Sequence, residues 1–205
     1  LDYGTGTFGD MGCHIYDPMY NAVGLTAPIS LRSEGPAPNA HSWAINAKIH
    51  YIFPGTKYTR DKTVPVTWYD GDQRPPANVS ERLGNRGLPG QGSVLFGTAG
   101  NMIIPHVGAP ILLPAEKYKD FKRPEVKGVN HWHQWIDACR GNGKPSAGFD
   151  YSGPLTEAIL LGGIATRFPN KTLKWDAKSL SFTNHEMATR LVRRKYRAGW
   201  EVKTL

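Results

Sequence analysis

Residues 42–53 read SWAINAKIHYIF, and this stretch decides the fold that the sequence predicts. Its odd-numbered residues, from Trp43 to Phe53, are all apolar, whereas most of its even-numbered residues are polar. Successive side chains of a strand point to opposite faces of the sheet, so this segment has one apolar face and one polar face. A strand with one packed face and one wetter face is typical of an antiparallel sheet.

Further strands are expected on both sides of this segment. Residues 28–34 and 64–69 carry β-branched and aromatic residues in partial alternation, as strands do. Three short apolar segments separated by tight turns predict a meander at one edge of the sheet: residues 93–96, 102–105 and 110–113. Two more short strands are expected around Trp175 and at residues 181–182.

Helices are expected before, between and after these strands. Residues 9–24 have apolar residues at every fourth position, with Asp10 as the expected N-cap and a kink at Pro18. The other expected helices cover residues 130–140, 153–168 and 184–192, the last with Asn184 as its cap; residues 70–92 are expected to be a long loop with at most one short helix. The prediction is a single α+β domain over residues 1–205, with a largely antiparallel open sheet and helices packed mainly on one face.

Composition excludes several classes of protein. A chain of 205 residues fits one large domain or two small ones, and 23 Gly with 16 Pro argue against an all-helical bundle. Two distant cysteines argue against a disulfide scaffold or a zinc ribbon, and no apolar run is long enough for a membrane span. The net charge of +8 favours anionic partners, but five of the positive charges lie within residues 190–197. Because that cluster has few interleaved aromatic residues, the sequence argues against nucleic acid as the partner.

The first residues suggest that more polypeptide precedes them. The chain begins LDYG, without Met, a basic segment or an apolar signal segment. We therefore expect the chain to be the downstream part of a longer protein. The compartment stays open: a soluble protein that is cytoplasmic or exported to the periplasm, depending on the missing N-terminal segment.

Residues 4–9 match the G-x-G-x-x-G pattern of dinucleotide-binding loops. That loop needs a buried strand before its first glycine, and only three residues precede Gly4. Asp10 and Asp17 would also place negative charge where a pyrophosphate needs free amides. The pattern is better interpreted as a flexible approach to a functional helix.

Asp10 and His14 are the residues best suited to chemistry. At i and i+4 they share one face of a helix, where a carboxylate can orient an imidazole that acts as a general base. The alternative is that Asp10 only caps the helix and His14 is a packed core residue. Around residue 131 the ligand types for a metal are present, but only His133 and Asp137 share a helix face, so no metal site is predicted. In that helix the apolar residues are expected to pack into the core: Trp132, Trp135, Ile136 and Cys139.

Several long segments resemble the C-terminal part of bacterial Gfo/Idh/MocA-family oxidoreductases. They include DYGTGTFGDMGCHIYDP (residues 2–18), VTWYDGDQRPP (66–76) and NHWHQWIDACRGNGKPSAGFDYSGPLTEAILLGGIATRFP (130–169). The resemblance implies an α+β domain that closes over a sugar or polyol, and a homo-oligomer formed through the open sheet face. The family's D-x-x-x-H signature falls on Asp10 and His14. It implies that His14 deprotonates a substrate hydroxyl while hydride leaves for the nicotinamide, and that Asp10 orients the imidazole or the substrate.

The chain also departs from that family. The dinucleotide fingerprint and a further catalytic lysine of the family's N-terminal Rossmann domain are not in these residues. NAD or NADP is therefore expected to bind mainly to an upstream domain, and the isolated chain is expected to be inactive. We place Tyr3 and Thr7 near the substrate because they flank the Gly-rich approach, and also Asn130 and His131 at the start of the Trp-rich helix. Two alternatives stay open: an NAD-dependent glycoside hydrolase of the same superfamily, and a noncatalytic carbohydrate-binding or oligomerisation domain.

Overall fold

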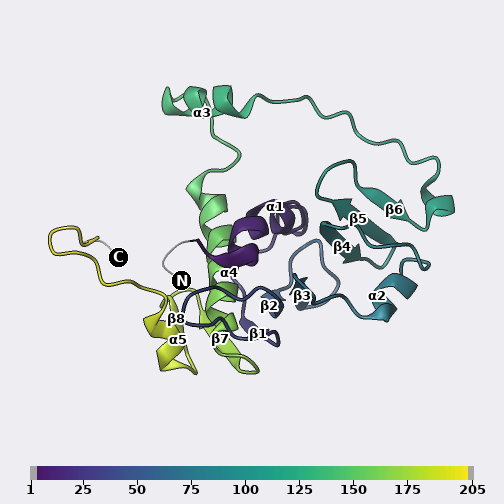
Figure 1. Cartoon of the computed structure of the whole chain (residues 1–205). Helices are drawn as coiled ribbons and strands as arrows, with labels where there is room; N and C mark the ends of the chain where they lie inside the picture. Colours follow the sequence, from purple (N-terminus) through teal and green to yellow (C-terminus); the bar gives the residue numbers. More distant parts are fainter. Residues whose placement is uncertain (1–3, 203–205) are drawn as a thin grey trace.

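The computed structural model describes residues 4–202 of the chain. They form five α-helices, one short 3-10 helix and eight strands in two separate antiparallel sheets (Figure 1). The expected α+β class with an open, antiparallel sheet is therefore confirmed.

The larger sheet has five strands in the order β3-β2-β1-β7-β8. Their bounds are β1 (Ser30–Ser33), β2 (Lys48–Pro54), β3 (Thr63–Tyr69), β7 (Thr172–Asp176) and β8 (Ser181–Phe182). In the register, Leu31 of β1 stands opposite Tyr51 of β2 on one side and Leu173 of β7 on the other. All three side chains are almost fully buried, so this row of residues forms the centre of the core.

Helices α1 (Gly6–Val23) and α4 (Phe149–Thr166) lie against each other and cover the apolar face of this sheet. The hydroxyl of Tyr51 crosses the interface and donates to the carbonyl of Ala158 in α4 at 2.9 Å. On the opposite face of the sheet, Arg32 and Lys48 surround the carboxylate of Glu34, at 3.4 and 2.8 Å. One face is therefore packed by helices and the other carries partly exposed charges, as the alternation in residues 42–53 predicted for β2.

The three short strands β4 (Gly92–Phe96), β5 (Asn101–Pro105) and β6 (Ile111–Leu113) form the expected meander. The expectation that it lies at the edge of the main sheet is wrong, because it is a separate sheet beside α1 (Figure 1). It has its own small core, in which Ile103 and Leu113 pack with Leu83, just after α2 (Ala77–Glu81). Leu83 comes from the long segment between β3 and β4, so part of this small core is supplied by residues expected to form a loop.

Residues 119–148, here called the α3 arm, follow the 3-10 helix η1 (Ala115–Tyr118) and extend away from the main sheet (Figure 1). The arm carries α3 (His131–Cys139), which has no buried residue. The expectation that Trp132 and Trp135 pack into the core is therefore wrong, because they are 68% and 64% exposed; Ile136 and Cys139 are exposed as well. A stripe of apolar residues makes a helix suited to burial. The described part of the chain, however, supplies no surface that covers the stripe of α3.

Two expectations about helix caps are also wrong. Helix α1 begins at Gly6 with Thr5 as its N-cap, so Asp10 lies inside the helix and does not cap it. The helix then continues through Pro18 to Val23. Helix α5 (Glu186–Arg190) is capped by the ring of His185, which accepts from the amide of Ala188. Asn184 instead binds the backbone of β7, accepting from the amide of Lys174 and donating to the carbonyl of Thr172.

Candidate active site

Thr7, Asp10 and His14 form a polar stripe along the exposed side of α1. Their spacing of i, i+3 and i+7 places them on one face of the helix, over about 10 Å of helix length. The opposite face carries buried residues such as Ile15 and Tyr16, which pack against the sheet. Because the apolar residues hold one side of α1 in the core, the stripe is turned toward solvent.

His14 is exposed, so the alternative in which it is a packed core residue is wrong. Asp10 is exposed as well and, within residues 4–202, no hydrogen bond joins the two side chains. The nearest ring to His14 belongs to His106, at the end of β5, with 5.8 Å between ring centroids and an edge-on angle of 87°. His14 is therefore accessible, with a carboxylate on the preceding turn and a second imidazole beside it.

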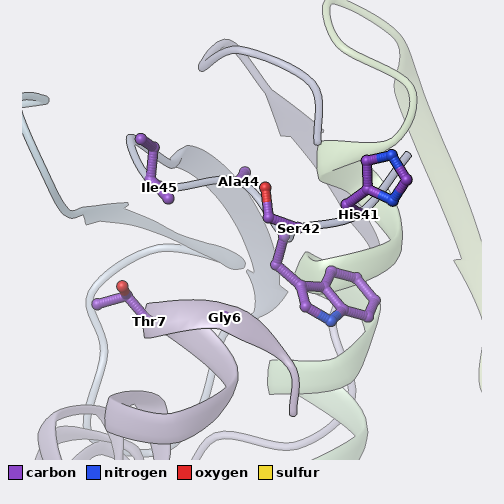
Figure 2. Close-up of a pocket in the computed structure, with 7 residues that line it drawn as sticks. Gly6, Thr7, His41, Ser42, Ala44 and Ile45 are labelled. Atoms are coloured by element: carbon purple, nitrogen blue, oxygen red, sulfur yellow. The ribbon is translucent and has the colours of Figure 1, made fainter. Parts of the chain in front are cut away.

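A hollow of about 390 Å³ adjoins the first turn of α1. It is lined by Gly6, Thr7 and residues 41–45, and Figure 2 shows Thr7 and His41 at its opposite ends. Gly6 needs to be a glycine, because its φ is +74° and a Cβ there would lie only 2.8 Å from the Cβ of Trp43. The indole N–H of Trp43 is buried and has no acceptor among the described residues. The hollow reaches Thr7 but is not lined by Asp10 or His14, which lie further along the same helix.

Residues 42–47 form a loop beside this hollow, although the sequence predicted a strand from residue 42. The side chain of Asn39 accepts from the amides of His41 and Ser42, which closes a turn. Ile45, expected on the packed face, is 69% exposed. The strand starts only at Lys48. Just before it, the amide of Ala47 donates to the buried carboxylate of Asp70 at 2.6 Å instead of to a neighbouring strand.

The structure brings together only part of the predicted substrate-binding set. Thr7 lies on the polar stripe with Asp10 and His14, and Tyr3 lies outside the described residues. Asn130 caps α3 by accepting from the amide of His133 at 3.0 Å, and it lines a second hollow of about 470 Å³ along the polar side of that helix. The ring of His131 lies against that of Trp132, with 3.9 Å between centroids.

Asn130 and His131 are therefore on an element that stands apart from α1 in Figure 1. The contact between His14 and His106 had not been predicted. The two residues are separated by 106 − 14 = 92 positions, and nothing in the sequence pattern relates them.

The described residues offer no dinucleotide cradle. In the G-x-G-x-x-G segment, Gly6 packs against Trp43, and a Cβ on Gly9 would fall 1.8 Å from the hydroxyl of Thr5. These glycines serve the start of α1, and no strand of the described chain leads into them. Residues 4–202 also contain no cluster of three or more His, Cys, Asp or Glu side chains that could hold a metal ion.

Comparison with known proteins does not assign the chain to a family: no family model matches it, and no curated protein matches it. None of the helices in the described part of the chain has both the length and the apolar character required to cross a membrane.

Proposed function

We propose that this chain is the substrate-binding and catalytic domain of an NAD(P)-dependent oxidoreductase that acts on a sugar, a polyol or a derivative. The observation that supports it best is the exposed face of α1, where His14 is open to solvent with Asp10 one turn before it. The resemblance of residues 2–18 to the family's D-x-x-x-H segment supports the same assignment.

In the proposed reaction, the imidazole of His14 accepts the proton of a substrate hydroxyl. The carbon that bears this hydroxyl loses its hydrogen with the C–H electron pair, as hydride, and its bond to oxygen becomes a carbonyl. The nicotinamide, when bound, supplies the hydride acceptor. Asp10, which shares this face of α1 with His14, orients the imidazole or the substrate. The hollow beside Thr7 holds a part of the substrate that does not react.

The large exposed area of the chain supports the proposal of a further domain that binds the nucleotide. A monomeric protein of 22.7 kDa is expected to expose ~9,500 Å². This chain exposes 14021 Å², an excess of about 4,500 Å² over that expectation. The exposed tryptophans of α3 contribute to this surface. We assign NAD or NADP to a nucleotide-binding domain that covers part of this excess area.

The open face of the main sheet is the proposed contact for a homo-oligomer. Glu34 on this face is paired with Lys48 at 2.8 Å and with His50 at 3.0 Å, and each of the three side chains is about one-third exposed. A second copy related by a twofold axis would present the same mixture of charges, so each cation could meet a carboxylate.

The test uses the chain together with the proposed nucleotide-binding domain. Reduction of NAD+ and NADP+ is followed with a panel of sugars and polyols, for the wild type and for His14→Ala. We expect His14→Ala to lower kcat at least ~100-fold, the usual contribution of a general base. His133→Ala is the matched control, because His133 is also an exposed helical histidine but lies on α3.

A His14→Ala variant with near-normal kcat would remove His14 from the mechanism. Cleavage of a glycoside without net reduction of the nicotinamide would favour the hydrolase. Sugar binding that does not depend on nicotinamide, with no turnover, would favour a noncatalytic carbohydrate-binding domain.

A further inference from the structure

The small sheet places a second histidine, His106, beside the proposed catalytic face of α1. The rings of His14 and His106 lie 5.8 Å apart between centroids and nearly perpendicular, and both residues are exposed. They come from different elements, α1 and the end of β5, so their proximity depends on how the small sheet is attached.

That attachment is specific. The hydroxyl of Ser93 in β4 donates to the carbonyl of Ile15 in α1 at 2.8 Å, one residue after His14. Leu95, two residues further along β4, packs against the main core, whereas Val94 packs into the core of the small sheet. One face of β4 therefore docks on the helical layer while the other faces its own sheet.

The end of β5 is held just as closely. The amide of His106 donates to the carbonyl of Gln91 at 3.0 Å. The next residue, Gly92, has a φ of +147°, and a Cβ there would lie 2.3 Å from the carbonyl oxygen of Ile104. Only glycine allows β4 and β5 to approach so closely, and this approach positions His106.

We propose that His14 and His106 together form a binding site for a vicinal diol, in which His106 binds the hydroxyl adjacent to the one that His14 deprotonates. The role of His14 in this site rests on the proposed function. A neutral imidazole donates through one ring nitrogen and accepts through the other, so two neighbouring rings suit two neighbouring hydroxyls. Within the described residues no third His, Cys, Asp or Glu completes a metal-binding group, so a polyol suits the pair better than a cation does.

Binding is measured separately from turnover. The imidazole resonances of His14 and His106 are followed by NMR while myo-inositol or glucose is added to the protein. We expect both rings to respond to the same titration, with the same apparent Kd. His106→Ala should weaken binding about 3- to 10-fold, the loss of one net hydrogen bond. Val107→Ala is the matched control, because Val107 is the next residue in the chain and is 83% exposed.

Turnover then separates positioning from chemistry. His106→Ala should raise KM about 3- to 10-fold and leave kcat within ~3-fold, whereas His106→Asn, which can still form a hydrogen bond, should recover most of the loss. With a series of monodeoxyglucoses, one analogue should bind equally to the wild type and to His106→Ala, because it lacks the hydroxyl that His106 binds.

Each result distinguishes this site from the proposed function. If His14→Ala abolishes turnover but His106→Ala changes neither KM nor Kd, the diol site is wrong and the oxidoreductase stands. If both rings respond to polyol but no nicotinamide is reduced, the diol site stands and the oxidoreductase is wrong. The proposal for His106 would be overturned if His106→Ala weakened the binding of every monodeoxyglucose equally. It would also be overturned if Val107→Ala weakened polyol binding as much as His106→Ala does.

Discussion

Two neighbouring glycines of α4, Gly162 and Gly163, should respond in opposite directions to substitution by alanine. A Cβ on Gly162 would lie 1.9 Å from the hydroxyl oxygen of Tyr51 and 2.3 Å from Cε1 of Phe8. A Cβ on Gly163 would lie 3.8 Å from its nearest neighbour, in Trp43, which is ordinary van der Waals contact. The two variants add the same methyl group to the same helix and differ only in what it meets.

The magnitude for Gly162→Ala follows from its surroundings. Tyr51 and Phe8 are only 1% and 4% exposed, so neither ring can swing into solvent to make room. Overpacking of a core costs about 1–3 kcal/mol, and displacing Tyr51 also endangers its hydrogen bond to Ala158, worth about 1 kcal/mol. Replacing glycine by alanine within a helix adds about 1 kcal/mol to the free energy of unfolding, because alanine has the higher helix propensity. We therefore expect Gly162→Ala to lower the free energy of unfolding by about 1–3 kcal/mol.

Gly163→Ala should raise the free energy of unfolding by about 0.5–1 kcal/mol, because only the helix preference changes. Urea unfolding followed by circular dichroism measures both values. In a thermal scan, a chain of this size should show Tm falling by roughly 2–12 °C for Gly162→Ala and rising by roughly 1–4 °C for Gly163→Ala. If Gly162→Ala is as stable as Gly163→Ala, the packing of α1, α4 and β2 described above is incorrect.

Other predictions concern buried and paired carboxylates. Asp70→Ala should cost about 2–5 kcal/mol in urea unfolding, because Asp70 accepts from the amide of Ala47 at 2.6 Å and from the indole of Trp68 at 2.7 Å, and both donors are buried; a cost below ~1 kcal/mol would show that other acceptors replace it. Hydrogen bonds from Lys48 and then His50 lower the pKa of Glu34 to about 2. The stabilisation by Glu34 is therefore complete above its ordinary pKa and is lost as the pH falls toward 2. Glu34→Gln should be less stable than the wild type by only ~0.5 kcal/mol at pH 6, since the pair is partly exposed, and the difference should vanish near pH 2; a difference independent of pH would refute the ion pair.

The strand pattern of residues 42–53 predicted β2 well where tertiary contacts agree with it. Ile49, Tyr51 and Phe53 are buried because α1 and α4 cover that face of the sheet. The same alternation failed before residue 48, where the turn at Asn39 and the acceptor Asp70 hold the backbone in a loop. Alternation with a two-residue period indicates which side chains share a face. It does not indicate which backbone amides form hydrogen bonds to a neighbouring strand.

The apolar stripe of α3 was predicted correctly as a stripe and wrongly as part of the core. Its polar side is tied to its own chain, since the side chain of Gln134 accepts from the amide and the hydroxyl of Ser146. Trp132 and Trp135 on the other side remain exposed. Helical periodicity identifies a face that favours burial, whereas the surface that covers it must come from elsewhere.

The candidate site was predictable in its local part only. The four-residue spacing of Asp10 and His14 requires a shared helix face, and this follows from helix geometry. Whether that face is buried or exposed depends on which side of α1 the core occupies. The approach of His106 depends on the register of β4 and β5 and on the bond from Ser93 to Ile15, which no local pattern encodes.

Isotope transfer tests the proposed role of His14 most directly. A polyol deuterated at the reacting carbon is incubated with NAD+ or NADP+ and the chain together with the proposed nucleotide-binding domain, and deuterium on the nicotinamide ring is measured by mass spectrometry. We expect the wild type to transfer the label in one step and His14→Gln to transfer it at least ~100-fold more slowly, with an unchanged Tm. Label transfer at the wild-type rate in His14→Gln, or a reduced nicotinamide without deuterium, would contradict the assignment of His14 as the base of a hydride-transfer reaction.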